Sequence, residues 1–284
     1  MSAGKISVRK PKIRKNNVKR RLFVFLLLAL LLMLVVIFAR QICPYDPDAQ
    51  IFGSLEPPSL EHPGGTDRYG RDLFSRILVG LQTSILSTLS LVAIITVVGT
   101  TVGVLCGHLG GVMDSLMMRV SDVCLAFPGL VFALAIAALL NGGLQNAVIA
   151  LAVISWPKYA RIARSQTLAL KNTDYIAASQ LAGCTGAQQI FRHILPNSMG
   201  PILVTAMLDI GTMMMELAGL SFLGLGAQPP TAELGNMMSG GRSMLQTYPW
   251  VIIGPGIAIF IAVVIFNLLG DTVRDYLDLR NSHR

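Results

Sequence analysis

The chain has 284 residues, of which 53% are hydrophobic and 13% are charged, and its formal net charge is +8 at pH 7. Soluble domains carry about 25% charged residues, and the mean hydropathy here is +0.61. This composition excludes an ordinary water-soluble enzyme or binding module, and it predicts a protein whose solvent is the lipid bilayer.

The chain begins with a basic arm, residues 1–21, which carries nine Lys and Arg and no acidic residue. A first transmembrane helix is predicted directly after it, at residues 22–39. Positive charge of this density beside a span stays on the cytoplasmic side. A basic arm can also bind nucleic acid, but adjacency to a span favours the topological explanation, and no nucleic-acid partner is expected. The apolar run is too long for a cleaved signal peptide, so we expect it to remain as an anchor.

Further apolar runs predict an all-α membrane protein with six transmembrane helices. Three of them are free of charge and long enough to cross the hydrocarbon core at about 1.5 Å per residue. These three runs are Thr83–Gly107, Val123–Leu140 and Trp250–Leu269. Two weaker runs, Leu144–Pro157 and Met199–Phe222, complete the count, the first being short and the second containing two acidic residues.

Threading six helices from an inside N-terminus divides the rest of the chain by side. It predicts an external loop at 40–82, a five-helix core at 83–270, a cytoplasmic loop at 158–198 within that core, and a cytoplasmic tail at 271–284. Five Lys and Arg then lie outside and 18 of the 23 lie inside. This asymmetry agrees with the rule that positive charge stays inside.

The cytoplasmic loop reads DYIAASQLAGCTGAQQIFRHILPN, in which Gly183 is followed twelve residues later by Leu195 and Pro196. This stretch resembles the EAA signature of ABC importer permeases. The signature of that family is a helix, a glycine turn and a second short helix that lodges in a groove of the ATPase subunit. The matching positions are Tyr175, Ala177, Ala178, Ser179, Gly183, Leu195 and Pro196. Because the signature glutamate is missing, we expect docking through shape and apolar contact.

Four other stretches resemble the dipeptide, oligopeptide and nickel permeases of this class. They are GTDRYGRDLFSRILVGLQTSI at 65–85, AFPGL at 126–130, LSFLGLGAQPPTAELG at 220–235 and FNLLGDTVRDYLD at 266–278. The segment LDIGTMMMELAGLSFLGLG is most similar to nickel-type permeases. The resemblance implies the type I permease fold, in the cytoplasmic membrane of a prokaryote with both termini inside, and small peptides or nickel and other metal chelates as substrate.

The same resemblance implies the partners of the chain. They are a second homologous permease subunit, two ATPase subunits or domains, an external solute-binding protein and the surrounding membrane lipid. The chain has no G-x-x-x-x-G-K-[ST] phosphate-binding loop, so we expect it not to be an enzyme and ATP hydrolysis to take place on other subunits. No cofactor and no bound metal are predicted, because no two histidines have the spacing of metal ligands.

Two acidic residues in the fifth predicted span are candidates for the substrate path. Asp209 and Glu216 are seven residues apart, so their carboxylates share one helix face with Met213 between them. An acid inside the membrane usually faces a cavity or a partner. The three residues therefore form either a cation-attracting stripe or, equally well, a contact with the second permease. Packing is the commoner role of methionine at such positions.

Charged residues in the external segments are candidates for contact with the binding protein. They are Arg68, Arg71, Glu233 and Arg242. The alternative for the arginines before the second span is a self-contained salt-bridge cluster that fixes the start of that helix.

A different functional class remains open, a secondary transporter or channel for small cationic solutes that works alone. Such proteins often contain inverted repeats and broken helices, and no internal repeat is visible here. A membrane enzyme is disfavoured, because no nucleophile with a base, cofactor fingerprint or metal cluster is present.

Overall fold

The computed structural model describes residues 15–281, and within them it contains no β-strand beyond one isolated bridge between Thr66 and Asp72. The α-helices, one π-helical segment (η1) and one 3-10 turn (η2) follow each other in chain order. They are α1 Lys15–Ile37, α2 Ala39–Ile42, α3 Leu73–Leu109, α4 Gly111–Ala126, α5 Gly129–Leu139, α6 Leu144–Lys171, α7 Asp174–Leu181, α8 Gly186–Gln189, η1 Ile190–Ile194, α9 Leu195–Phe222, α10 Leu234–Gly241, η2 Arg242–Met244 and α11 Trp250–Asn281.

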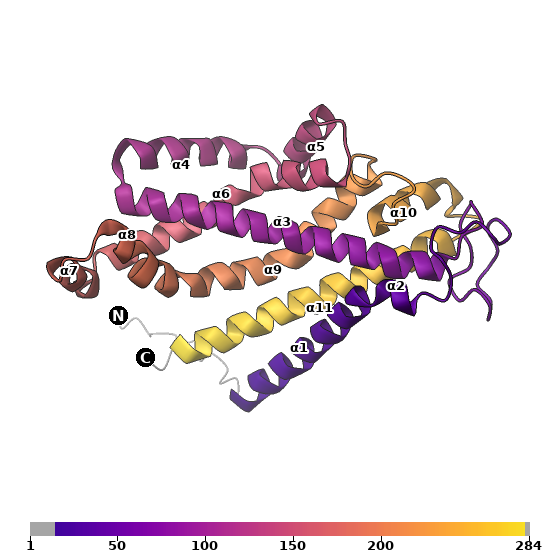
Figure 1. Ribbon diagram of the computed structural model, residues 1–284, viewed down its shortest axis with the longest axis horizontal. Coiled ribbons are helices and arrows are strands. Elements are labelled where there is room, and N and C mark those ends of the chain that lie inside the picture. Colours follow the sequence, from indigo (N-terminus) through magenta and orange to yellow (C-terminus); the bar gives the residue numbers. More distant parts are fainter. Residues whose placement is uncertain (1–14, 282–284) are drawn as a thin grey trace, which may run out of the picture.

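Long helices run along the long axis of the molecule, with the pair α7–α8 at one end and the irregular residues 43–72 with α10 at the other (Figure 1). Helices α3 and α6 are in close contact through glycines. Gly99, Gly103 and Gly107 face α6 at four-residue intervals, and a methyl group at Gly103 would lie 2.2 Å from the carbonyl oxygen of Ala160. Small residues at such intervals let two helix backbones approach closely inside a membrane.

The all-α membrane fold is confirmed, although its spans are not six equivalent helices. Four stretches are long and apolar enough to cross a bilayer: α1 from Asn17, α3, the stretch Gly186–Phe222 and α11 as far as Leu277. The pair α4–α5 is a fifth if it counts as one span. Helix α6 has 28 residues, about 42 Å, but polar residues at its start and basic residues in its second half leave it outside that apolar class.

The third predicted span, Val123–Leu140, is not one helix. Between α4 and α5 the chain bends by 97°. The break falls at Phe127 and Pro128, where Phe127 is extended with φ −102° and ψ 151°. Proline has no N–H to donate and disfavours helical geometry in the residue before it. The hydropathy of this run therefore predicted its burial in the membrane but not its direction.

Three other boundaries differ from the predicted ones. Helix α3 begins at Leu73, ten residues before the predicted span, because Asp72 caps it and accepts a hydrogen bond from the Ser75 N–H at 2.8 Å. Helix α6 continues to Lys171 and α11 to Asn281, so the starts of the predicted loop at 158–198 and tail at 271–284 are helical. An apolar run marks only the part of a helix in hydrocarbon, whereas the hydrogen-bonded helix extends beyond it.

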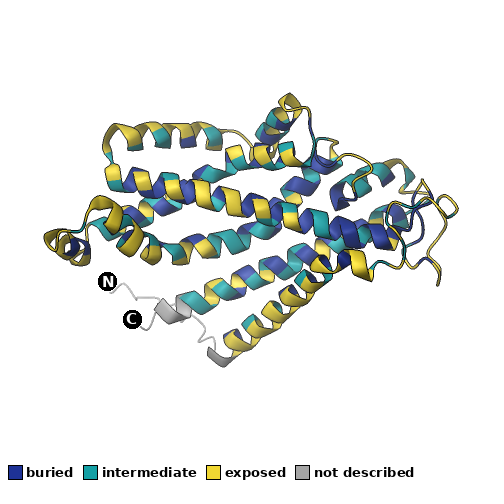
Figure 2. Ribbon diagram, in the orientation of Figure 1, coloured by how far each residue is buried: buried dark blue, intermediate teal, exposed yellow. Residues whose placement is uncertain are grey.

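The core consists of two packed clusters. One lies among α3, α5, α6 and α9 around Tyr159 and Leu217, and the other lies among α1, α3, α9, α10 and α11 around Met214 and Phe266. The outer faces of α1 and α4 are largely exposed (Figure 2). Most of the exposed side chains in the apolar part of α1, and many of those in α4, are apolar, for example Phe23 at 66% and Val112 at 85%, which suits lipid or a neighbouring subunit and not water.

Candidate functional site

The turn after α7 has the geometry of a Schellman motif. Gly183 has φ +82°, a left-handed conformation that favours glycine. Its N–H donates to the Gln180 carbonyl at 2.9 Å, and the Cys184 N–H donates to the Ser179 carbonyl at 3.1 Å. Thr185 then caps α8 in a reciprocal capping box with Gln188. The glycine turn between two short helices is therefore a defined structure and not a loose loop.

The exposed surface of α7, α8 and η1 includes several apolar side chains among polar ones. Tyr175 is 53% exposed, Leu181 91% and Phe191 70%, and Ala177 and Ala178 are exposed beside them. Exposed apolar side chains grouped among polar ones are typical of an interaction site. Leu181 and Phe191 were not among the predicted contacts, because neither is one of the positions that were matched to the EAA signature.

The other predicted coupling residues lie beneath or beside this surface. Ser179 is buried, and its hydroxyl donates to the Ile176 carbonyl at 2.7 Å. Ile176 is itself 1% exposed and anchors α7 in the core. Leu195 is half-buried and Pro196 is exposed at the start of α9. Ser179 therefore holds α7 in place and does not face outward.

From Gly186 to Phe222 the chain is continuously helical, and we call this stretch the lever. It passes from α8 through the π-helical segment η1 into α9 without a break. Tyr175 joins α7 to the lever, since its ring meets that of His193 edge-on at 5.0 Å and its hydroxyl is hydrogen-bonded to His193 Nδ1. Tyr175 thus connects α7 to the helical stretch that continues into α9.

The start of the lever also meets the C-terminal ends of α3 and α6. A methyl group at Gly186 would lie 3.0 Å from Nε2 of His108, in the last turn of α3. Lys171, at the end of α6, donates from Nζ to the His108 carbonyl at 2.7 Å. Three helix ends therefore converge beneath the exposed surface of α7, α8 and η1.

Asp209, in the middle of the lever, is paired within the chain. Its Oδ1 lies 2.6 Å from Lys158 Nζ, and its Oδ2 accepts a hydrogen bond from the Tyr159 hydroxyl at 3.0 Å. Asp209 is 4% exposed and Met213 is 7% exposed in the core between α9 and its neighbours. Within this chain, therefore, Asp209 is neutralised by an ion pair and Met213 is packed in the core, whereas both were expected in a cation-attracting stripe or in a contact with the second permease.

Glu216 differs from Asp209. Its side chain is half-buried, and it makes no hydrogen bond or ion pair with any residue in 17–277, the range whose side chains the structure describes. Lys158 was expected in the cytoplasmic loop, and it lies instead within α6 beside the middle of α9. The sequence analysis assigned Lys158 to a loop because an apolar run ends just before it, and it therefore missed the ion pair with Asp209.

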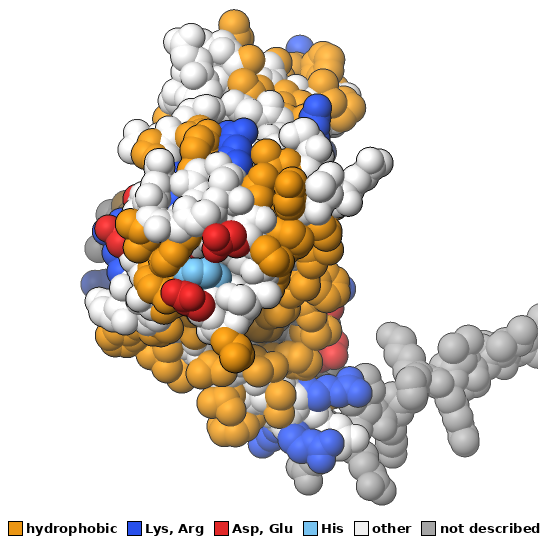
Figure 3. All heavy atoms as spheres, turned by 90° about the vertical axis from the view of Figure 1, so that its right-hand side faces the viewer, with side chains coloured by type: hydrophobic (Ala, Val, Ile, Leu, Met, Phe, Trp, Pro, Cys, Tyr) orange, Lys and Arg blue, Asp and Glu red, His pale blue; other side chains and the backbone are white. Residues whose placement is uncertain are grey.

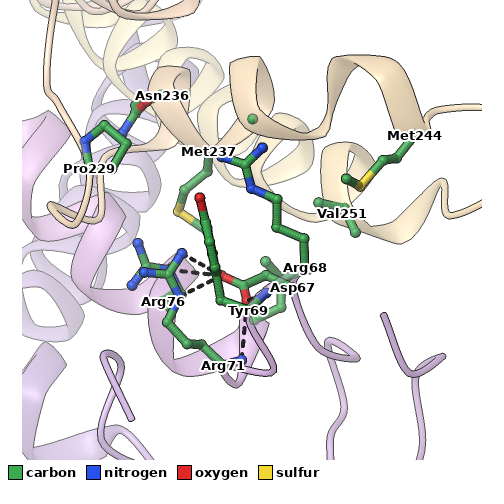
Figure 4. A pocket seen from close by; sticks show the side chains of 12 residues that line it. Asp67, Arg68, Tyr69, Arg71, Arg76, Pro229, Asn236, Met237, Met244 and Val251 are labelled. Carbon is green, nitrogen blue, oxygen red and sulfur yellow. Dashed lines mark hydrogen bonds and ion pairs between the residues drawn. The ribbon is translucent and has the colours of Figure 1, made fainter. Parts of the chain in front are cut away.

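At the opposite end, a buried ion-pair network ties residues 43–72 to α3 (Figure 4). Arg71 Nη2 lies 2.6 Å from Asp67 Oδ2, and both side chains are about one tenth exposed. Arg76 donates to Asp48 at 2.8 Å and to the Pro230 carbonyl at 3.0 Å. The alternative of a self-contained cluster is therefore correct for Arg71, which has no free face to offer to a partner.

Glu233 is a helix cap and not a surface charge. It is 0% exposed, and its carboxylate accepts from the N–H groups of Gly235 and Asn236 at the start of α10. The Ser84 hydroxyl of α3 also donates to it, at 2.9 Å. The expected contact of Glu233 with a binding protein is wrong, because a side chain that is fully enclosed cannot reach one.

Arg68 and Arg242 are exposed at this end of the molecule. Arg68 lies over the ring of Tyr69, with its Cζ 4.7 Å from the ring centroid. Seen face-on, the end shows a few charged side chains of both signs beside a histidine, with apolar surface around them (Figure 3). Nearby, Cys43 donates to the Ser75 carbonyl, and burial raises the pKa of its thiol, which keeps it protonated.

Comparison with known proteins decides the family. Residues 99–283 match the family model described as the binding-protein-dependent transport system inner membrane component. This match covers the break in α4–α5, the glycine turn and the whole lever. The chain belongs to this permease family.

Several curated relatives of this permease cover nearly its whole length. The probable D,D-dipeptide transport system permease protein of Escherichia coli K12 is 44% identical over 249 residues, which is 87% of this chain and 84% of the relative. The dipeptide transport system permease protein of Alkalihalophilus pseudofirmus is 43% identical over 224 residues, 79% and 74% of the two chains. The glutathione transport system permease protein of Escherichia coli O6:K15:H31 is 44% identical over 254 residues, 89% and 84%.

Among solved structures, the permease resembles a chain from the inward-facing MetNI methionine ABC transporter. The TM-score is 0.55, with 20% identity, 70% coverage of this chain and 95% of that one. This likeness shows the ABC importer permease fold. The rest of this permease has no counterpart in that smaller chain.

Proposed function

We propose that this permease is one of two membrane subunits of an ABC importer for small peptides. The observation that carries the proposal is the exposed surface of α7, α8 and η1 with its apolar side chains, fixed by the Gly183 turn to the start of a continuous helical lever. Such a surface suits docking of an ATPase subunit, whose movement on nucleotide binding is transmitted to α9. ATP hydrolysis then belongs to two partner subunits.

The inner side of the membrane is assigned to the end that carries α7 and α8. The described start of α1 and the end of α11 point toward this same end (Figure 1). Lys19, Arg20 and Arg21 are exposed there, and basic residues beside a span favour the cytoplasm. These features support a multi-pass inner-membrane protein in which the described start of α1 and end of α11 face the cytoplasm, with residues 43–72 and α10 outside.

The external solute-binding protein is assigned to the opposite end. Arg68 and Arg242 are the predicted contact residues that remain exposed, so we assign the docking of this partner to them. The buried network around Arg71 and Arg76 supports the surface from beneath. A rigid platform of this kind limits the entropy lost when a partner binds.

Peptides are the favoured substrate class. The relatives named above are called dipeptide, D,D-dipeptide and glutathione permeases, and all of these substrates are short peptides. The suggested kinship with nickel permeases gains no support from these relatives. The same holds for a transporter that works alone.

Reconstitution of the full heteromer tests the proposal. Proteoliposomes that hold both permease subunits and the ATPase subunits, with the binding protein outside, are expected to accumulate a labelled dipeptide only when ATP is present inside. Liposomes with this chain alone provide the control. Uptake by the isolated chain, or no uptake by the complete heteromer with any short peptide, would contradict the proposed role.

A further inference from the structure

The charged pair Lys158–Asp209 lies far from the ends of its helices. Lys158 is fourteen residues from Leu144 and thirteen from Lys171, and Asp209 has the same position in α9 between Leu195 and Phe222. The Asp209 side chain is 6% exposed, whereas that of Lys158 is 52% exposed. A charged group that faces lipid costs several kcal/mol, so this face of α6 and α9 must border water or another protein.

Glu216 extends the same face toward the outer end. It lies seven residues, or two helical turns, beyond Asp209. Lys158 Nζ is held at 2.6 Å by Asp209, but its side chain is 52% exposed and its ammonium has further N–H donors. Glu216, in contrast, has no ion pair among the side chains that the structure describes. A carboxylate in this position is suited to an incoming cation.

We propose that Glu216 and Lys158 form a transit site for a zwitterionic peptide, with the peptide ammonium at Glu216 and its carboxylate at Lys158. Asp209 and Tyr159 are positioning residues, which hold the Lys158 ammonium on the open face of α6. This inference rests on the proposed function of peptide import. It names the two free termini, and not the side chains, as the groups that the membrane path recognises.

The dimensions of the site agree with short peptides. Seven residues of helix separate the two carboxylates by about 10 Å along the axis, and Lys158 is held at the Asp209 level. An extended peptide of two or three residues spans about 7–10 Å. A di- or tripeptide therefore bridges the two charges, and hydrogen bonds to charged groups at each end are the stronger kind.

The decisive variant is Glu216→Gln, which keeps the shape and removes the charge. With the binding protein saturated and the labelled dipeptide carrying both free termini, we expect the number of peptides imported per ATP hydrolysed to fall about tenfold. ATP hydrolysis stimulated by the binding protein is expected to stay unchanged, since the coupling face is untouched. Glu216→Asp retains the charge and is expected to recover most of the import.

Stability of the heteromer distinguishes the peptide site from a contact with the second permease. Removal of an unpaired, half-buried charge is expected to leave the melting temperature unchanged or to raise it. A lower melting temperature or loss of the second subunit on purification would show that Glu216 pairs with that subunit, and it would overturn the transit site. Wild-type import per ATP in the Glu216→Gln heteromer would overturn it as well.

A second variant tests the other half of the site. Lys158→Gln combined with Asp209→Asn removes both charges at once, so that no ionised group is left buried without a partner. Import per ATP is expected to fall again while assembly persists, and unchanged import would overturn the role of Lys158. If the wild-type heteromer imports no peptide, the proposed function fails; if it imports and the variants match it, only the transit site fails.

Discussion

Lys158 Nζ lies 2.6 Å from Asp209 Oδ1, and this ion pair joins α6 to the middle of the lever. Helix α6 is in turn held against α3 by the glycines of α3. A movement that begins at α7 and α8 therefore either carries these helices together or separates the two charges.

Gly183→Pro is expected to uncouple transport. Proline fixes φ near −65°, whereas Gly183 has φ +82° and donates its N–H to Gln180. Peptide uptake should fall at least tenfold while the permease still reaches the membrane. Gly183→Asn is the control, because asparagine tolerates the left-handed conformation. Full uptake by the proline variant, with normal assembly, would show that the turn does not transmit movement.

Leu181→Ala together with Phe191→Ala is expected to weaken ATPase binding. These side chains are 91% and 70% exposed, and apolar anchors of an interface contribute about 2 kcal/mol or more each. Copurification of the ATPase subunits should fall by an order of magnitude or more. Leu60→Ala is the matched control, since Leu60 is fully exposed among the external residues 43–72. Equal recovery of ATPase in all three preparations would place the docking face elsewhere.

Lys158→Met alone is expected to destabilise the chain, because it leaves Asp209 charged and buried. Loss of one partner of a fully buried pair costs about 3–5 kcal/mol. Here we expect about 1–3 kcal/mol, since the Lys158 side chain is 52% exposed and screened by solvent. Adding Asp209→Asn should restore most of the stability. Thermal unfolding of the purified heteromer measures both changes, and a double variant no more stable than the single one would refute the pairing.

Gly103→Ala is expected to push α3 and α6 apart. A methyl group there would lie 2.2 Å from the Ala160 carbonyl oxygen, and overpacking of this kind costs about 1–3 kcal/mol. The control is Gly200→Ala in α9, where a methyl group would meet nothing within 4 Å and where alanine favours the helix. The melting temperature should fall in the first variant only.

Glu233→Ala and Arg242→Ala are expected to separate stability from partner binding. Glu233 caps α10 and accepts from Ser84, so its loss should cost about 1–2 kcal/mol. Arg242 is exposed, so its loss should weaken the binding protein and leave stability unchanged. Binding protein titrated onto the purified heteromer gives the affinity. An unchanged affinity for Arg242→Ala would remove that residue from the docking surface.

Much of the fold was predictable because a bilayer imposes simple requirements on a sequence. The runs at Thr83–Gly107 and Trp250–Leu269 lie within α3 and α11, since every spanning backbone group must be hydrogen-bonded and a helix achieves this locally. The bend at Pro128 was not predicted, because the hydropathy of a run does not show where the helix axis changes direction. The glycine turn at Gly183 was predicted from its spacing to Pro196, and it has the left-handed φ that such a turn requires.

The candidate sites were less predictable, because a side chain's role depends on partners that are distant in sequence. Asp209 meets Lys158 across 51 residues, and Glu233 meets Ser84 across 149. In the sequence Asp209 and Glu233 are isolated charges, so both were predicted to be available to a ligand or partner. The spacing of Asp209 and Glu216 did predict that they share one helix face. Which of the two carboxylates is neutralised, however, is decided by the position of Lys158 in the folded chain.

The glycines at 99, 103 and 107 carry no side chain toward α6, so backbone and side-chain atoms of α6 at Ala160, Ala163 and Thr167 pack directly on the backbone of α3. Because the atoms of the two helices interdigitate so closely, neither helix can slide along the other without a steric clash. We therefore expect α3 and α6 to travel as one rigid body during each transport cycle, and the change of shape to be absorbed where α4 turns into α5.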